Sequence, residues 1–315
     1  MSKVKVGVVG VGHMGREHAR IYAKSANAEL VGVHDADASA ADKIARQHGT
    51  RAYARLDDLL ADAEALTIAA PTFAHAEIGL KAIEKGRHLL IEKPLADTLE
   101  NARSLVAAAA KAGTILQVGH IERFNPAFHA LESLLTHPKF IEAHRLSPYP
   151  GRSTDIGVVL DLMIHDIDII LHLVRSPLES VHAVGIPVLS KGEDIANARM
   201  VFRNGCVANI TTSRISPEKL RKIRVFQDDA YLSLDYQNQS GEIYRKEGEK
   251  ITRNKIPVQK DEPLKLELES FLDCIRAKHN PRVDGVQAAD ALEVAMKIVE
   301  QIWSNPVTAS RHPQP

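Results

Sequence analysis

Carboxylate and imidazole side chains recur along one segment of otherwise aliphatic residues. Asp161, His165, Asp168 and His172 are spaced i, i+4, i+7 and i+11, which places them on one face if the segment is a helix. The neighbouring positions are large aliphatics, so we expect the other faces of this helix to be buried. Asp161, one turn before His165, can orient the imidazole and support its protonated form. The pair therefore has the arrangement that a general base needs.

Two other interpretations of this polar stripe stay open. Asp168 and His172 are better explained as structural groups that are satisfied by hydrogen bonds than as catalytic groups. Histidine and aspartate at helical spacing are also types of metal ligand. The sequence offers no obvious further ligand cluster, so we expect no metal.

A glycine loop lies near the start of the chain, between an apolar run and a helical pattern. Gly10 permits a tight turn, Gly12 lets a pyrophosphate approach the backbone, and Gly15 lets helix and strand pack closely. The free N–H groups at the start of the helix would meet the phosphates. The loop reads Gly10-Val11-Gly12-His13-Met14-Gly15. This pattern predicts a dinucleotide site.

An acidic residue stands where the second strand is expected to end. Asp35 follows Gly15 by twenty residues, where a carboxylate would accept hydrogen bonds from the ribose hydroxyls. A 2′-phosphate would be repelled by Asp35, and Asp37 adds to the repulsion. We therefore expect NAD(H) to be preferred over NADP(H).

A charged pair and a proline follow the fifth expected strand, as Glu92-Lys93-Pro94. The carboxyl edge of a parallel sheet is where such folds bind ligands. Lys93 would reach toward substrate and nicotinamide. Taken alone, Lys93 would be a solvated lysine at a strand end.

Short apolar runs alternate with helical patterns in the first part of the chain, which predicts a doubly wound α/β domain on a parallel sheet. The expected strands are Val4–Val9, Leu30–His34, Ala65–Ala69, His88–Ile91 and Thr114–Val118. The expected helices are His13–Ala26, Ser39–His48, Ala74–Lys85 and Thr98–Ala112.

The pattern changes after Gly119 to strands in series, which predicts a second, α+β domain on a largely antiparallel, open sheet. Successive strands are expected from Val181 to Pro257, after a strand at Phe140–Arg145. The expected helices are Pro126–Thr136, Val158–Val174, Leu264–Lys278 and Gly285–Ile302. We expect domains at 1–120 and 121–303, and a flexible tail at 304–315.

Composition limits the partners of this chain of 315 residues. Forty basic and forty acidic residues give a formal net charge of zero, which argues against nucleic acid or an anionic membrane as a general partner. Two cysteines without a C-x-x-C pair suggest neither a disulfide framework nor a zinc site. We find no signal peptide or membrane span and expect a cytoplasmic protein.

The motifs together resemble the Gfo/Idh/MocA oxidoreductase family over essentially the whole chain. They are Gly10-x-Gly12-x-x-Gly15, Ala70-Pro71-Thr72 followed by His75, Glu92-Lys93-Pro94, and Asp161-x-x-x-His165-Asp166-x-Asp168. The resemblance implies an NAD(P)-dependent enzyme that oxidises a hydroxyl group of a sugar, cyclitol or related polyol. It implies that Lys93, Asp161 and His165 are the catalytic group. Many members have a glycine where this chain has Met163, which bears on the shape of the pocket.

The glycine loop, the loops next to the motifs and the resemblance together indicate a pocket for the cofactor and one for the substrate. The expected NAD-binding residues are Gly10, Gly12, His13, Met14, Gly15, Asp35, Pro71, Thr72, His75, Glu92 and Lys93. The expected substrate-binding residues are Lys93, Arg123, Asn125, Arg152, Asp161 and His165. Arg123 and Arg152 are expected to meet a diphosphate. The basic run from Arg214 to Arg224 is better explained as a charged strand edge.

Two stretches are similar to the branch of the family that oxidises UDP-N-acetylglucosamine at C3, whose 3-keto product is later aminated for a variant lipid A. These stretches are 119–126 and 161–168. The alternatives are dehydrogenases of free sugars, cyclitols or UDP-sugar acids, a redox-neutral enzyme that retains NAD, and a non-catalytic NAD(H)-sensing regulator. The open sheet needs cover, so we expect a homo-oligomer, a dimer or tetramer.

Overall fold

The computed structural model describes residues 2–149 and 156–304, which fall into two compact units. The first unit comprises residues 1–121 and Glu262–Ala289, and the second comprises Glu122–Asp261 and the chain from Asp290 onward. This division assigns residues 262–289 to the first unit, whereas the sequence analysis placed them with 121–303. The tail expected at 304–315 lies outside the described residues, apart from Ser304.

The first unit is built on a six-stranded, fully parallel sheet in the order β3-β2-β1-β4-β5-β6. The strands are β1 (Val4–Val9), β2 (Ala28–His34), β3 (Arg51–Ala52), β4 (Ala65–Ile68), β5 (His88–Glu92) and β6 (Leu116–Gly119). The helices are α1 (His13–Lys24), α2 (Ala38–His48), α3 (Leu56–Asp62), α4 (His75–Glu84), α5 (Leu99–Ala112) and α8 (Pro263–Ala277). The strand order reverses between β1 and β4, and ligands of such sheets bind beside this switch point.

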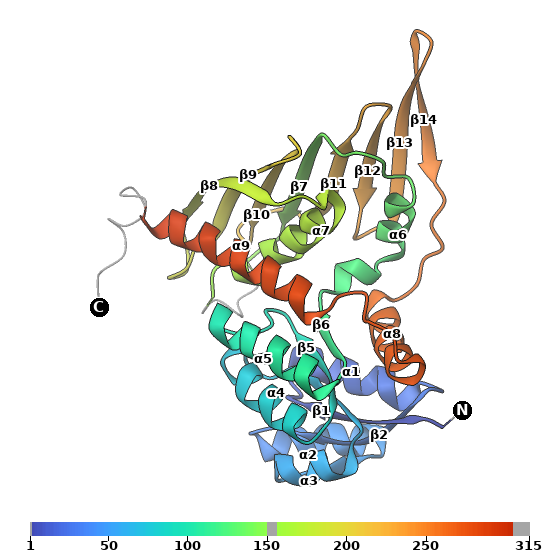
Figure 1. Cartoon of the computed structure of the whole chain (residues 1–315), viewed down its shortest axis with the longest axis vertical. Helices are drawn as coiled ribbons and strands as arrows, with labels where there is room; N and C mark the ends of the chain where they lie inside the picture. The colour runs from blue at the N-terminus through green and yellow to red at the C-terminus, as the bar shows by residue number, and fades with distance from the viewer. Residues whose placement is uncertain (1, 150–155, 305–315) are drawn as a thin grey trace. The chain divides into compact units, whose positions relative to one another are not determined.

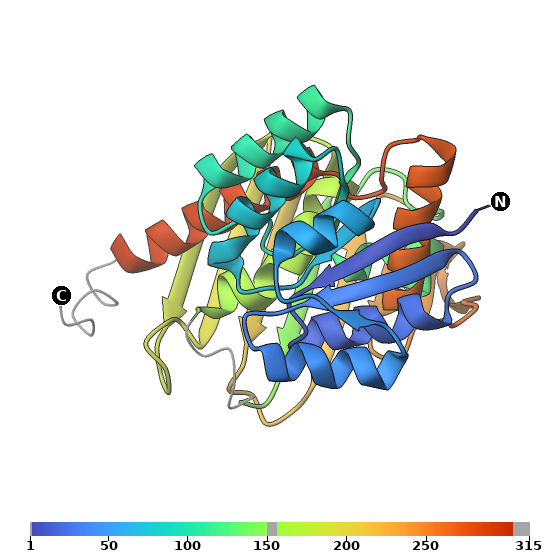
Figure 2. The same ribbon diagram turned by 90° about the horizontal axis from the view of Figure 1, so that it is seen from below.

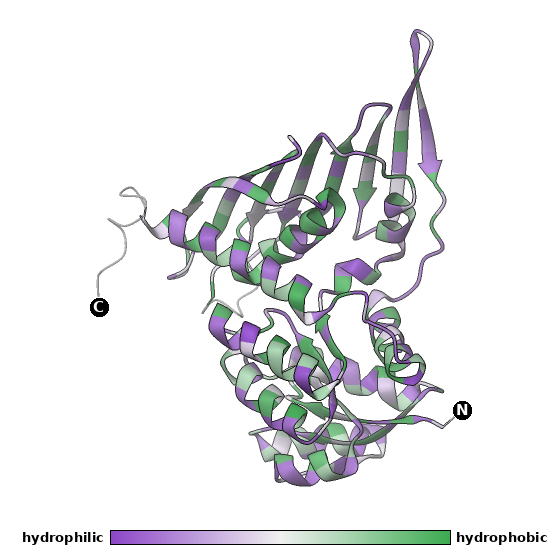
Figure 3. Ribbon diagram, in the orientation of Figure 1, coloured by the Kyte–Doolittle hydropathy of each residue, from purple (hydrophilic) through white to green (hydrophobic). Residues whose placement is uncertain are grey.

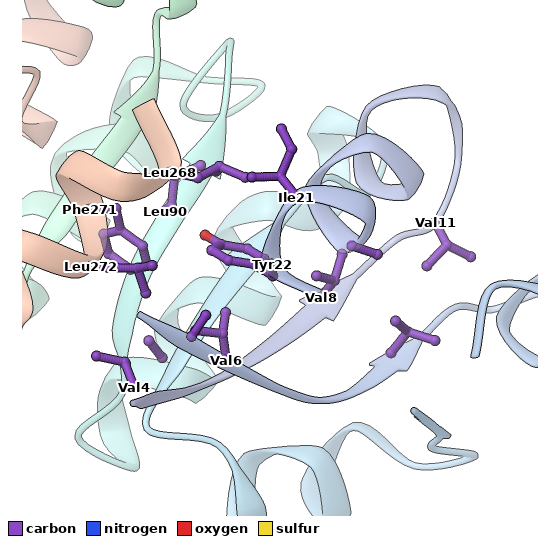
Figure 4. Packing of buried hydrophobic residues seen from close by; sticks show 14 of the residues in the cluster. Val4, Val6, Val8, Val11, Ile21, Tyr22, Leu90, Leu268, Phe271 and Leu272 are labelled. Atoms are coloured by element: carbon purple, nitrogen blue, oxygen red, sulfur yellow. The ribbon is translucent and has the colours of Figure 1, made fainter. Parts of the chain in front are cut away.

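The faces of this sheet follow from the alternation of side chains along β1. Val4, Val6 and Val8 point to one face, where they pack in a core with α1, α2 and α8. Figure 4 shows Tyr22 of α1 in this core, near the apolar residues of α8. Gly7 faces the opposite side, where its missing Cβ leaves room for Leu59 of α3. The sheet is therefore covered on both faces, as Figure 2 shows for the blue and cyan helices.

The second unit is built on an eight-stranded sheet in the order β14-β13-β12-β11-β7-β10-β9-β8. All neighbouring strands pair antiparallel except β7 and β10, which are parallel. The strands are β7 (Phe140–Leu146), β8 (Leu178–Ile186), β9 (Ile195–Phe202), β10 (Val207–Ser213), β11 (Leu220–Phe226), β12 (Ala230–Asp235), β13 (Ser240–Glu247) and β14 (Lys250–Ile256). The prediction of an α/β domain followed by a largely antiparallel α+β domain is confirmed.

Helices lie over one face of this second sheet, as Figure 1 shows for α6 (Pro126–Glu132), α7 (Ile164–Val174) and α9 (Gly285–Ser304). Ile141 and Ala143 of β7 are buried under them, whereas the alternate residues of that strand stay half-buried. Figure 3 shows the outer strands β13 and β14 to be largely hydrophilic. This polarity suits the end of an open sheet, because exposed strand edges are protected by charge.

The structure adds elements that the sequence patterns did not indicate. Strand β3 has two residues and helix α3 has seven, too few for a hydrophobic period to be recognised. The expected helix Val158–Val174 begins as a π-helical turn at Val159–Met163 and continues as α7. Within the described ranges, no helix combines the length and the apolar character that crossing a membrane requires.

Candidate active site

The glycine loop joins β1 to α1 with the geometry that its pattern predicts. Gly10 has a φ of +83°, and a Cβ there would lie 2.5 Å from the backbone nitrogen of Ala70. A Cβ on Gly15 would lie 1.7 Å from the carbonyl oxygen of Gly10. Only glycine therefore permits this turn and the close packing of helix against strand.

Gly12 differs from its two neighbours in the loop, because its Cβ would meet nothing within 4 Å. It is the N-cap residue of α1, with no side-chain hydrogen bond to the cap, and the first turn carries no acidic residue. An α-helix leaves its first N–H groups without intrahelical partners, and they attract anions. The open space at Gly12 and this helix start fit the pyrophosphate of a dinucleotide.

Asp35 fastens the glycine loop to the end of β2. Its carboxylate accepts hydrogen bonds from the backbone N–H of Val11 at 2.7 Å and of Asp37 at 2.9 Å. Each carboxylate oxygen has a second lone pair, so Asp35 can also accept hydrogen bonds from ribose hydroxyls. Asp37 caps α2 by accepting from the backbone N–H groups of Ser39 and Ala40. Two negative charges thus lie where a 2′-phosphate would have to bind.

The segment after β4 packs against the turn that follows β5. Pro71 precedes a 3-10 turn at Thr72–Ala74, which leads directly into α4. The buried imidazole of His75 lies 2.9 Å from the carbonyl oxygen of Ala70 and 3.0 Å from that of Pro94. His75 therefore lies between two loops at the carboxyl edge of the sheet, with each ring nitrogen beside a carbonyl oxygen of one loop.

The Glu92-Lys93-Pro94 turn begins on the last residue of β5. Glu92 is buried, and its carboxylate lies 3.0 Å from Nε2 of His18 and accepts a hydrogen bond from the backbone N–H of Lys93 at 3.3 Å. Burial acts to raise the pKa of Glu92, but His18 and the charge of Lys93 outweigh it, so that pKa is lowered. The residue predicted to line the cofactor pocket is thus a buried carboxylate behind Lys93.

In the second unit, Asp161 and His165 straddle the junction between a π-helical turn and α7. Asp161 lies inside the turn Val159–Met163 and His165 in the first turn of α7. Asp161 is half-buried, and His165 is 9% exposed. Single π-helical turns inside helices occur frequently at functional sites, because the extra residue re-aims the side chains that follow.

The next acidic residues of this helix serve its packing. Asp166 accepts two hydrogen bonds from Arg145 of β7, at 2.8 and 3.1 Å, and Arg145 also donates to Glu122 at 3.0 Å. Burial acts to lower the pKa of Arg145, but the two carboxylates outweigh burial, so the pKa of Arg145 is raised above its ordinary value. The guanidinium therefore stays charged and joins α7 to the sheet.

Arg123 lies in a similar buried contact. It is 1% exposed, and its Nη1 lies 3.3 Å from a carboxylate oxygen of Asp168, while its Nη2 lies 2.8 Å from Nδ1 of His172. Asp168 and His172 therefore both contact the buried guanidinium of Arg123, which fits the expectation that they are structural groups. A guanidinium with these contacts holds α7 in place, a different task from the expected diphosphate binding.

Asn125 caps α6 by accepting a hydrogen bond from the backbone N–H of Ala127 at 3.1 Å, and it donates to the carbonyl oxygen of Tyr236. Its amide is buried and is used within the protein, so the geometry does not place it on a substrate surface. Arg152, expected to bind a diphosphate, lies outside the described residues.

The structure reveals a support for the start of the π-helical turn before α7 that sequence reasoning missed. Glu193 accepts a hydrogen bond from the backbone N–H of Val159 at 3.1 Å. Arg214 is buried; it donates to Asp194 at 2.8 Å and to the carbonyl oxygen of Ile156 at 2.7 Å. Arg214 was placed in a charged strand edge, but its guanidinium is part of this buried network. Its partners Asp194 and Ile156 lie in two separate segments that are distant in sequence, which no spacing rule could indicate.

Comparison with known proteins agrees with this geometry. Residues 4–120 match the family model described as "Oxidoreductase family, NAD-binding Rossmann fold", and residues 135–233 match the "GFO/IDH/MocA C-terminal domain". The chain is 37% identical over 307 residues to UDP-N-acetylglucosamine 3-dehydrogenase of Acidithiobacillus ferrooxidans, covering 95% of this chain and 97% of that protein.

Two further similarities show how far the likeness reaches. A solved structure of the Acidithiobacillus ferrooxidans UDP-N-acetylglucosamine 3-dehydrogenase superposes with a TM-score of 0.91 over 96% of this chain and 98% of the other. Glucose-6-phosphate 3-dehydrogenase of Bacillus subtilis is 30% identical over 238 residues, covering 67% of this chain and 68% of that protein.

Proposed function

The chain belongs to the GFO/IDH/MocA family of NAD-binding oxidoreductases, and from that premise we propose that it oxidises UDP-N-acetylglucosamine at C3 to the 3-keto sugar. The observation that carries the proposal is the Asp161–His165 pair at the π-helical start of α7. A protein that only sensed NAD(H) would have no use for an acid one turn before a histidine on an otherwise apolar helix. The near-complete coverage of the UDP-N-acetylglucosamine 3-dehydrogenase supports the substrate.

NAD, when bound, supplies the hydride acceptor of this reaction. The first unit contributes its binding site: Gly12 and the start of α1 for the pyrophosphate, and Asp35 for the ribose. Pro71 and Thr72 continue the pocket along the carboxyl edge of the sheet, where His75 fixes their loop.

Three side chains carry the proton chemistry in the proposed reaction. His165 accepts the proton of the sugar hydroxyl, and Asp161 orients the imidazole and stabilises the imidazolium that forms. Lys93 donates a hydrogen bond to the same hydroxyl oxygen and so favours the developing alkoxide. Positioning of this kind is the protein's main contribution in a hydride transfer.

The diphosphate of a nucleotide sugar needs cations, and the buried contacts of Arg123 and Arg214 leave neither guanidinium for it. We therefore assign this role to Arg152. Replacement of Arg152 by Ala should raise KM for the UDP-sugar about tenfold or more, with kcat less affected, because a charge-assisted contact of 1.4 kcal/mol corresponds to a factor of ten. An unchanged KM would remove Arg152 from the site.

A panel of UDP-sugars, sugar phosphates and free polyols tests the substrate, with NADH formation followed by its near-ultraviolet absorbance. UDP-N-acetylglucosamine should give the highest kcat/KM. Glucose 6-phosphate is the informative competitor, because a glucose-6-phosphate 3-dehydrogenase is also similar to this chain. Preference for that sugar phosphate would replace our substrate and keep the reaction class.

We also propose that the chain works as a homo-oligomer in a reducing compartment, the cytoplasm. On the face of the second sheet opposite the helices, half-buried rings stack in a row from Phe226 through Tyr231 to Tyr244, with centroid distances of 4.7 and 4.9 Å. A second copy could cover these rings. Cys206 and Cys274 are buried free thiols, as a reducing compartment allows.

A further inference from the structure

Three ionisable side chains that the proposed reaction does not use meet inside the first unit. They come from separate elements: His18 from α1, Glu92 from β5 and Glu267 from α8. They are 0%, 7% and 1% exposed, respectively. Nε2 of His18 lies 3.0 Å from Oε1 of Glu92, and ligand-type atoms of all three residues lie within 4.8 Å of one another. Three titratable groups so close together, out of contact with water, cannot all carry independent charges.

The surroundings of the cluster decide which of these groups is charged. Burial, and then the negative charge of Glu92, raise the pKa of Glu267 well above its ordinary range, which favours the protonated form of Glu267. Glu92 is held ionised by His18 and by the charge of Lys93, against the effect of burial. The surroundings thus favour one ionised carboxyl group, Glu92, and one protonated carboxyl group, Glu267, with the imidazole of His18 beside Glu92.

The carboxylate of Glu92 lies against the backbone of its neighbours. A Cβ on Gly119 of β6 would lie 2.9 Å from Oε2 of Glu92, so the carboxylate lies flat against that glycine. The same Oε2 accepts a hydrogen bond from the backbone N–H of Lys93 at 3.3 Å. Glu92 therefore links His18 directly to the residue that begins the turn after β5.

We propose that His18 is a positioning residue for Lys93, acting through a buried cluster in which His18, Glu92 and Glu267 lie within reach of one another. The proposal rests on the proposed function, because it concerns the lysine that contacts the substrate hydroxyl. His18 fixes the carboxylate of Glu92, which accepts a hydrogen bond from the backbone N–H of Lys93 and interacts electrostatically with the charge of Lys93. Glu267 is the third member of the cluster, and in its protonated form it adds no second negative charge beside Glu92.

The charged and titratable groups that face Glu92 come from each element packed around it. His18 faces it from α1, Glu267 from α8 and Lys93 from its own turn. Strand β6 contributes only uncharged groups there, Gly119 and Gln117; the Gln117 side chain donates to the carbonyl oxygen of Glu267 at 3.0 Å. Removal of His18 therefore removes the main group that keeps Glu92 ionised.

Replacement of His18 tests the proposal through the pH dependence of turnover. In His18→Leu we expect kcat to fall about tenfold or more, KM for NAD to stay within about threefold, and the acid limb of the pH–rate profile to move up by about one pH unit. In His18→Gln an amide can still donate to Glu92, so most of kcat should return. His88→Gln is the matched control, because His88 lies on the same strand as Glu92 but its ring accepts a hydrogen bond from the backbone N–H of Ile115.

Infrared spectroscopy tests the protonation of the cluster without a measurement of enzyme turnover. The infrared carbonyl band of a protonated carboxyl group should be present in the wild type at neutral pH and absent in Glu267→Gln. Elemental analysis of the purified chain separates protons from a metal, because histidine and two glutamates are also ligand types. A bound divalent cation in stoichiometric amount, or no such infrared band, would overturn the cluster.

The two proposals fail in distinguishable ways. If no sugar yields NADH with the wild type, the proposed function fails, and the infrared band and the elemental analysis still decide the cluster. If the wild type is active and His18→Leu keeps both its kcat and its pH profile, the positioning role is wrong. Should His18→Leu fail to fold, His18→Gln and the wild-type infrared band carry the test.

Discussion

Replacing two glycines of one loop by alanine should have opposite consequences, because their surroundings differ. A Cβ at Gly12 meets no atom within 4 Å, whereas a Cβ at Gly15 lies 1.7 Å from the carbonyl oxygen of Gly10. The first methyl group enters the space that we assign to the pyrophosphate. The second collides with the backbone of the loop, which no side-chain rotation can relieve.

The structure gives each substitution a magnitude. Gly12→Ala loses some N-cap preference but restricts the unfolded chain, so the free energy of unfolding should change by less than about 1 kcal/mol. The affinity for NADH should fall about tenfold or more, equivalent to about 1.4 kcal/mol. Gly15→Ala forces the backbone apart and should cost about 3 kcal/mol or more, which lowers Tm by roughly 6–12 °C.

Thermal unfolding and NADH fluorescence titration measure the two effects on the same samples. We expect Gly12→Ala to unfold near the wild-type temperature but bind NADH weakly, and Gly15→Ala to unfold at a clearly lower temperature. Gly113→Ala is not a suitable control, because its φ of +68° strains any alanine there. Gly12→Ala with wild-type affinity for NADH would refute the placement of the pyrophosphate.

Further predictions concern charge, pH and thiol chemistry. Asp35→Ser should narrow the preference for NADH over NADPH, measured as the ratio of their Kd values, because one of the two charges that repel a 2′-phosphate is removed. Asp166→Asn leaves Arg145 buried with one carboxylate fewer and should lower the free energy of unfolding in urea by about 3–5 kcal/mol. The pKa of Glu267 is raised in the folded chain, so unfolding releases its proton, and the free energy of unfolding falls as the pH rises from the ordinary pKa of glutamate toward the raised one. Glu267→Gln should remove this dependence of the free energy of unfolding on pH. An equal dependence in both proteins would contradict the prediction. Burial raises the pKa of Cys206 to about 11, so this thiol should resist alkylation near neutral pH until the chain is unfolded.

Local sequence patterns predicted the fold because the hydrophobic residues of each helix or strand repeat with the period of that element. Strand β1 was predicted with the observed bounds, Val4–Val9, and helices α1 and α5 ended within two residues of their predicted ends. Helix α8 was recognised as a helix, but its place in the first unit depends on contacts with α1, far away in sequence. Periodicity says which face of a helix is apolar and leaves open what covers it.

For the site, too, the sequence predicted local structure but not contacts between distant segments. The glycine loop is a local structure, so its spacing predicted its geometry. The partners of Arg123 could not be predicted, because its ion pair with Asp168 forms only when α7 packs against the segment before α6. His18 carries no signal of its own in the sequence, and its cluster with Glu92 and Glu267 draws on three separate elements.

The most direct test of the central claim is incubation of the purified protein with NAD⁺ and UDP-N-acetylglucosamine, with NADH followed by absorbance and the sugar product identified by NMR. We predict NADH formation in step with a 3-keto sugar, and its loss in both His165→Ala and Lys93→Ala at saturating substrate. Oxidation at another carbon, or turnover that survives both substitutions, would contradict the account.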